Sequence, residues 1–167
     1  MKKSLFFLGI LVALFAETSC TKNADGEKIQ EKKATEFLTS INGHKYRLTD
    51  FYSDAPIDYI ETDSEVKKET DLKPYIKTYL IDDENLFDAS GVVKISQNNS
   101  KFPGDNSAVI TRNYHVGFDA SNVMLDFVDY NYVPVTYKVG NFTTTTFSIY
   151  LTWHTGAKIY SVFTRLD

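Results

Sequence analysis

The chain has 167 residues with 18 basic and 22 acidic side chains, a formal net charge of −4 and a single cysteine. This length fits one domain that buries a core without a disulfide staple. The acidic balance argues against nucleic-acid binding, which requires a basic face, and it gives no electrostatic attraction to anionic lipid.

The first residues form a basic and then apolar segment that ends at the only cysteine, Cys20. Lys2 and Lys3 precede an apolar stretch over 5–16, which is too short to span a membrane, and small residues come just before the thiol. This arrangement resembles a bacterial lipoprotein precursor. The resemblance implies a signal peptide over 1–19 and acyl chains on Cys20 that hold the protein to a membrane.

The residues around the cysteine refine the location. Lipoproteins with Asp directly after the cysteine tend to stay at the inner membrane, whereas this chain has Thr21, so outer-membrane delivery follows by analogy. Glu17 stands where that family usually has an apolar residue. The alternative is therefore an ordinary secretory signal in which Cys20 is incidental.

Residues 21–36 are polar and charged and carry no apolar stripe. This composition predicts a flexible tether over 20–36 that lifts the domain off the bilayer. Phe37, Leu38 and Ile41 are expected to mark the start of the folded domain, which then covers 37–167.

Short runs rich in Tyr, Phe, Val, Ile and Thr, separated by turn signals, predict an all-β domain. The eight expected strands are 44–52, 84–88, 91–97, 108–118, 122–129, 132–139, 142–153 and 158–166. The turns expected between them include 88–91, 119–122, 140–141 and 154–157, where Asp, Asn, Ser and Gly gather. Sequential hairpins favour a single up-and-down antiparallel barrel, which also removes exposed edges.

The segment 71–80 breaks the strand pattern and has two interpretations. Leu72, Ile76, Tyr79 and Leu80 share a helical stripe, with Asp71 as a cap and Pro74 in the first turn. We expect a short lid helix, and the alternative is a ninth, edge-like strand.

Alternation along the strands assigns an inner face. In 142–153 this face carries Phe147, Ile149, Leu151 and Trp153. The other expected inner residues are Ile110, Tyr114, Val116, Phe118, Val123, Leu125, Phe127, Val133, Val135, Tyr137 and Val139. With strands running up and down, the long connections 53–83 and 98–107 emerge at one end, called the mouth, and the tight turns lie at the other end, called the base.

Three short motifs resemble the lipocalin-like domains of small Gram-negative lipoproteins. They are residues 42–48 at the first strand, 83–91 at the first hairpin and 162–166 at the last strand. The resemblance covers about 37–167 and implies a ligand-binding barrel. In lipocalins a tryptophan of the first strand packs under an arginine of the last; here Tyr46 and Arg165 either make that contact or are independent surface residues.

No pattern points to catalysis, a cofactor or a metal. His44, His115 and His154 are expected at different places on the barrel, so they do not form a zinc site. The acidic clusters 82–84 and 126/129 lack the spacing of a calcium loop, and no phosphate-binding or nucleophile motif occurs.

Arg112 is the one charged residue whose parity places it on an inner face, toward the mouth. It either pairs with an anionic ligand group or extends outward at the rim. The aromatic residues that could stack on a ligand are Tyr75, Tyr79, Tyr114, Tyr137 and Trp153, and core filling accounts for them equally well.

The sequence therefore supports two hypotheses. The first is a non-enzymatic, membrane-anchored binder of a small apolar or amphipathic ligand. The second is a structural or accessory subunit that docks on an outer-membrane protein complex through its Tyr- and Thr-rich outer face.

Overall fold

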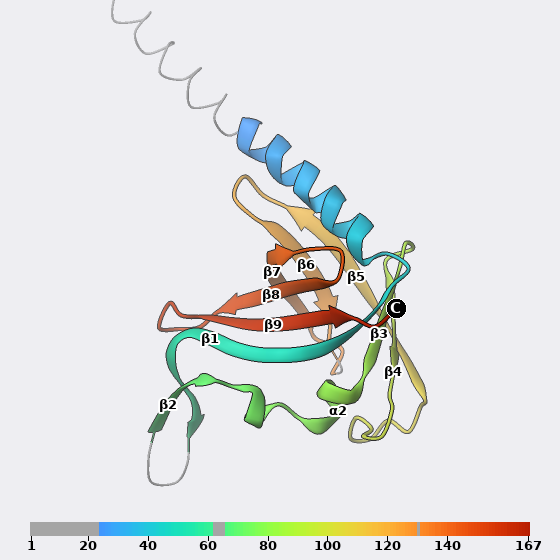
Figure 1. Ribbon diagram of the computed structural model, residues 1–167, viewed down its shortest axis with the longest axis vertical. Coiled ribbons are helices and arrows are strands. Elements are labelled where there is room, and N and C mark those ends of the chain that lie inside the picture. Colours follow the sequence, from blue (N-terminus) through green and yellow to red (C-terminus); the bar gives the residue numbers. More distant parts are fainter. Residues whose placement is uncertain (1–23, 62–65, 130) are drawn as a thin grey trace, which may run out of the picture.

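Nine antiparallel strands form one sheet that closes into a ring in the computed structural model, which describes residues 24–61, 66–129 and 131–167 (Figure 1). The strands are β1 (Lys45–Glu61), β2 (Val66–Asp71), β3 (Glu84–Asp88), β4 (Val92–Ser96), β5 (Val109–Phe118), β6 (Val123–Val128), β7 (Pro134–Phe142), β8 (Thr146–Thr152) and β9 (Lys158–Arg165). From β3 onward each strand pairs with the next along the chain. The prediction of an all-β, antiparallel, ring-closed domain is confirmed.

β1 closes the ring because it pairs with a strand at each of its edges. Tyr46 lies opposite Arg165 of β9 on one side and opposite Asn85 of β3 on the other. The far half of β1 leaves the ring and pairs with β2, where Ile57 lies opposite Glu69. β2 is thus an outer hairpin strand, and the other eight of the nine strands form the ring.

Tyr46 and Arg165 meet at this closure. The Tyr46 side chain is fully buried and its hydroxyl donates to the Ser40 carbonyl at 2.9 Å. Burial raises the pKa of Tyr46, and the positive charge of Arg165 lowers it in part. The two residues are therefore neighbours across the strands, and the alternative of independent surface residues is wrong. The Arg165 guanidinium itself donates to Asp167 and to the Thr144 carbonyl.

The expected flexible tether is wrong for residues 24–36, which belong to a helix over 24–41. Ala34, Phe37 and Ile41 form a buried stripe at helical spacing on this segment, whereas Leu38 is exposed. The Phe37 ring meets the edge of Phe147 with ring centroids 5.5 Å apart. The helix packs against the base of the ring, at the end opposite α2 in Figure 1. The polar composition of 24–36 did not indicate this helix, because the helix is stabilised mainly by packing against the ring.

The segment 71–80 fits neither expectation fully. The alternative of a strand over 71–80 is wrong, because β2 ends at Asp71, whose carboxylate accepts from the Lys73 N–H at 3.1 Å. A 3-10 helix, η1 (Lys73–Tyr75), follows with Pro74 in its first turn. The helix α2 (Thr78–Asp82) begins later than predicted. Leu72 leaves the expected stripe because it is buried in a second cluster with Ile57.

The turn expected at 140–141 lies instead at 143–145. β7 continues through Gly140. A Cβ atom at this position would lie 2.5 Å from the Ser148 hydroxyl oxygen, so glycine is needed where β7 and β8 approach closely. The Thr143 hydroxyl accepts from the N–H groups of Thr145 and Thr146, which forms the true turn. The expected turns after Asp88 and Asp119 are present, each with the aspartate accepting from following backbone N–H groups.

The inner-face prediction holds in the middle of the ring and fails at strand ends. Phe147 and Ile149 are buried, but Leu151, four residues along from Phe147, is 40% exposed. Phe118, the last residue of β5, and Val133, in the connection just before β7, are likewise exposed. Strand pairing places the turns at 89–91, 119–122 and 143–145 at the base. The connections over 72–83, 97–108, 129–133 and 153–157 lie at the mouth.

Candidate ligand-binding cavity

A cavity of about 320 Å³ lies inside the ring, between the aromatic core of the base and the connections of the mouth. Its apolar lining consists of Leu48, Leu80, Phe87, Phe102, Leu125, Phe127, Phe147, Ile149 and Phe163. Its polar lining consists of Tyr79, Asn85, Asp129, Asn131, Tyr137 and Ser161. These residues come from β1, β3, β6, β7, β8 and β9 and from three mouth segments, so the cavity depends on closure of the ring.

The floor of the cavity is a fixed group of aromatic rings. Phe147 stacks on Phe163 with centroids 4.9 Å apart, and it meets Phe87 and Tyr46 edge to face. Phe37 from the helix over 24–41 covers Phe147 from below. Such edge-to-face contacts fix ring orientation and make the floor rigid.

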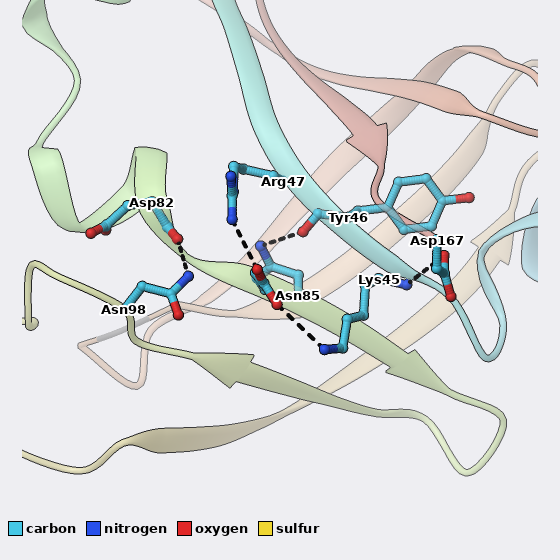
Figure 2. A network of polar contacts seen from close by, with 8 residues as sticks. Lys45, Tyr46, Arg47, Asp82, Asn85, Asn98 and Asp167 are labelled. Carbon is cyan, nitrogen blue, oxygen red and sulfur yellow. Dashed lines mark hydrogen bonds and ion pairs between the residues drawn. The ribbon is translucent and has the colours of Figure 1, made fainter.

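The roof consists of α2 and the 97–108 connection. The Tyr79 ring of α2 meets the edge of Phe102 with centroids 5.4 Å apart. The Asp82 carboxylate accepts from the N–H groups of Asn99 and Ser100, each at 2.9 Å, and the Asn98 side chain donates to the Asp82 carbonyl (Figure 2). These bonds join α2 to the 97–108 connection.

Beneath α2, a polar network ties β1 to β3. The Arg47 guanidinium lies 2.9 Å from the Glu84 carboxylate and the Lys45 ammonium lies 3.4 Å from it. Asn85 donates to the Tyr46 carbonyl in the same region (Figure 2). Because these ion pairs are partly exposed, they fix geometry more than they add stability.

Polar groups gather at the mouth end of the cavity. The Asp129 carboxylate shapes the β6–β7 connection, since its Oδ1 accepts from the N–H groups of Asn131 and Val133, each at 2.8 Å. Burial raises the pKa of Tyr137 and the negative charge of Asp129 raises it further. Burial also raises the pKa of Tyr79, with the charges of Asp129 and Asp83 acting in the same direction.

The structure brings together two of the aromatic residues predicted to contact a ligand. Tyr79 and Tyr137 line the cavity. Tyr114 is buried in the base, where its hydroxyl donates to the Asp88 carbonyl at 2.8 Å and burial raises its pKa. Tyr75 is exposed on η1, and Trp153 packs on the second cluster, with its indole N–H donating to Asp58.

Arg112 does not line the cavity, and it does not extend outward at the rim. It is 6% exposed and donates to the carbonyls of Asp129 and Thr111 at 3.1 and 2.8 Å. Its guanidinium lies 4.1 Å from the centre of the Tyr132 ring, and Tyr132 has a φ of 63°, in the left-handed region. We assign Arg112 as a positioning residue that holds the 129–133 connection against β5.

The remaining sequence candidates are separated in space. His44 faces Asp167, His115 faces Asp126 and His154 faces Asp58, each as a separate pair. Among the described residues no group of three or more His, Cys, Asp or Glu side chains is placed to hold a metal ion. Cys20 and the segment 1–19 lie outside the described residues.

Sequence reasoning missed most of the polar lining. Asp129 and Asn131 have the composition of an ordinary turn, and nothing local distinguishes a turn at a cavity from any other. Ser161 and Phe163 alternate along β9, so extending the parity argument to the last strand would have placed them inside. Phe102 belongs to a connection, where no periodic signal exists.

Comparisons with protein-family models, with curated proteins and with solved structures found no match to this chain. Across the described residues, no helix combines the length and the apolar character needed to cross a membrane. The function is therefore argued from the geometry of the cavity.

Proposed function

We propose that this protein is a membrane-anchored, non-enzymatic binder that holds a small apolar or amphipathic ligand inside its ring, as lipocalin-like domains do. The observation that supports this proposal is the hollow interior. A ring of eight strands can be filled completely by its own side chains, or it can leave space for one small ligand. Here a volume of about 320 Å³ remains inside.

The lining suits such a ligand. Ligand sites are mostly apolar pockets of about 300 to 1,000 Å³ with a few polar groups that fix orientation. In this cavity the aromatic floor lies toward the base, and Tyr79, Asp129, Asn131 and Tyr137 lie toward the mouth. An apolar tail would point toward the base, and a polar end would meet these groups under the roof.

The proposed anchor fits this orientation. The helix over 24–41 packs on the base, and the sequence before it leads to Cys20. Acyl chains on Cys20 would hold the base toward an outer membrane and leave the mouth directed away from it. Two or more acyl chains are required for stable anchoring, since one chain holds only marginally.

A cavity-filling variant tests the proposal. Leu125 lies on the cavity wall of β6, whereas its neighbour Met124 alternates to the outer face. We expect Leu125→Trp to weaken binding of a neutral, environment-sensitive naphthalene dye at least tenfold. The matched control Met124→Trp should bind the dye as the wild type does. Circular dichroism of each variant checks that it remains folded.

Two results would contradict the binder. One is a wild-type protein that shows no saturable dye binding. The other is equal dye affinity in the Leu125→Trp and Met124→Trp variants, which would place the dye outside the ring.

A structural or accessory subunit of an outer-membrane complex is the alternative. An aromatic row on the outer face favours it: Tyr52, Tyr160 and Tyr150 lie side by side on β1, β9 and β8, with successive ring centroids 5.1 and 5.2 Å apart. Lys158 lies 5.2 Å from the centre of the Tyr150 ring. Tyrosine is enriched at protein interfaces.

Native mass spectrometry of the full chain extracted from its own membrane separates the two hypotheses. The binder predicts an acylated chain that retains a small ligand and no stoichiometric protein. The accessory subunit predicts a stoichiometric membrane partner without a small ligand.

A further inference from the structure

We propose that the polar end of the ligand is an amine or a similar cationic hydrogen-bond donor, held by the Asp129 carboxylate at the mouth of the cavity. This inference rests on the proposed function and specifies the ligand class. It differs from the sequence expectation, in which Arg112 was the candidate partner for an anionic group.

Among the described residues that line the cavity, Asp129 is the one with a charged side chain. The other polar side chains there are neutral: Tyr79, Asn85, Asn131, Tyr137 and Ser161. A ligand whose polar end reaches the mouth therefore meets a negative charge surrounded by groups that can accept as well as donate hydrogen bonds.

The Asp129 carboxylate is well placed to accept from a ligand. The backbone N–H groups of Asn131 and Val133 both donate to its Oδ1. They orient the carboxylate, and no bond to Oδ2 occurs within the residues that the structure describes, so Oδ2 can accept from an incoming donor. The negative charge of Asp129 also raises the pKa of both Tyr79 and Tyr137, after burial. The charge thus acts on both hydroxyl groups that line this end of the cavity.

Two cations near the mouth, Arg112 and Lys101, bond to backbone carbonyls. Arg112 donates to the carbonyls of Asp129 and Thr111 and lies over the Tyr132 ring. Lys101 donates to the Gln97 carbonyl at 2.7 Å. Neither cation is among the residues that line the cavity.

The charge balance gives an order of preference for three head groups on the same tail. An ammonium forms a charge-assisted hydrogen bond with Asp129, which is stronger than the neutral bond of an alcohol. A carboxylate in the same place would put two like charges together, which disfavours the ionised form of each. We therefore expect amine to bind better than alcohol, and alcohol better than carboxylate.

Competition with the bound naphthalene dye tests this order. Decylamine, decanol and decanoate share a tail length, and near neutral pH the amine is protonated and the acid is ionised. The three are compared below the concentrations at which they aggregate. We expect the wild-type protein to bind decylamine at least tenfold more tightly than decanoate, with decanol between them.

Asp129→Asn keeps a side-chain oxygen for the two backbone bonds and removes the charge. It should weaken decylamine binding about tenfold and leave decanol within about twofold. The matched control is Asp126→Asn, which removes the same charge from the outer face of β6, where Asp126 contacts His115 and Thr136. This control should leave all three affinities within about twofold.

The failure of this inference is distinct from the failure of the proposed function. Decanoate that displaces the dye as well as decylamine does from the wild type would overturn the cationic assignment while the binder stands. Unchanged decylamine affinity in Asp129→Asn would also overturn it. Dye binding that is insensitive to Leu125→Trp would overturn the binder itself. Should Asp129→Asn fail to fold, the wild-type order alone decides.

Discussion

The base and the mouth of the ring are made of the same strands but are stabilised in different ways. At the base, the helix over 24–41 packs on the ring, and Phe37, Tyr46 and Phe147 are at most 1% exposed. At the mouth, short helical turns and aspartate-bonded connections surround the cavity. The base therefore gives the domain its stability, whereas the mouth can be specialised for a ligand without loss of the core.

The largest expected effect compares two residues of one strand and one face. Phe147 is buried at the base and Leu151 is 40% exposed at the mouth. Phe147→Ala should lower the free energy of unfolding by about 3 to 5 kcal/mol, the usual cost of removing a core aromatic ring. Leu151→Ala should cost less than about 1 kcal/mol. Urea unfolding of both variants measures the difference, and equal losses would contradict the contrast between the two ends.

An intermediate effect is expected at Arg112, which joins the mouth to the body of the ring. Arg112→Met removes the charged hydrogen bond to the Asp129 carbonyl and should cost about 1.5 to 3 kcal/mol. Hydrogen exchange of the Asn131 and Val133 amides should accelerate, because both belong to the connection that Arg112 holds.

Arg112→Lys provides the conservative comparison. It keeps the charge but lacks the planar fork that reaches two carbonyls, so it should recover less than half of the loss. Full recovery by lysine, or unchanged amide exchange in Arg112→Met, would show that Arg112 does not position the connection.

The smallest expected effect concerns acid. The N–H groups of Ser121 and Asn122 bond to the Asp119 carboxylate and hold its pKa below the ordinary value of 3.8. A lowered folded-state pKa means that this stabilisation is present above about pH 3.8 and is lost as the pH falls through the folded-state pKa. In Asp119→Ala the free energy of unfolding should therefore decrease less than in the wild type as the pH falls below about 3.8.

The corresponding residue at the mouth is Asp105, whose pKa is lowered by its bonds to Ser107. Asp105→Ala should change the global acid profile less than Asp119→Ala does, because mouth connections can open without unfolding the ring. Denaturant titrations at several acidic pH values measure both profiles. A larger effect from Asp105 would reverse the assignment of stability to the base.

Periodic segments were predictable and aperiodic ones were not. The eight expected strands correspond to β1 and β3–β9, because short runs rich in apolar and aromatic residues, bounded by turn residues, mark them. The outer strand β2 and the long extension of β1 were missed as a unit because the sequence VKKETD of β2 is charged and offers no apolar alternation. The helix over 24–41 was missed for a similar reason, since its sequence is mostly polar and only one narrow stripe of it is apolar.

For the candidate site, Tyr79 and Tyr137 were found by their aromatic character, whereas Tyr75, Tyr114 and Trp153 have other places in the fold. Parity correctly placed Arg112 on the inner face of β5, where it is buried, but its partners were not predictable. The Asp129 carbonyl and the Tyr132 ring lie on a different strand connection, and no local pattern joins them to β5.

The sequence by itself determined the strand periodicity, the turn chemistry and the acidic balance of this protein, because each depends on residues close together in the chain. Tertiary structure decided that β1 meets β9, that a polar helix covers the base and that the interior stays hollow. It also decided that Asp129 rather than Arg112 lines the cavity. These features depend on contacts between distant segments, where packing and burial override local preference.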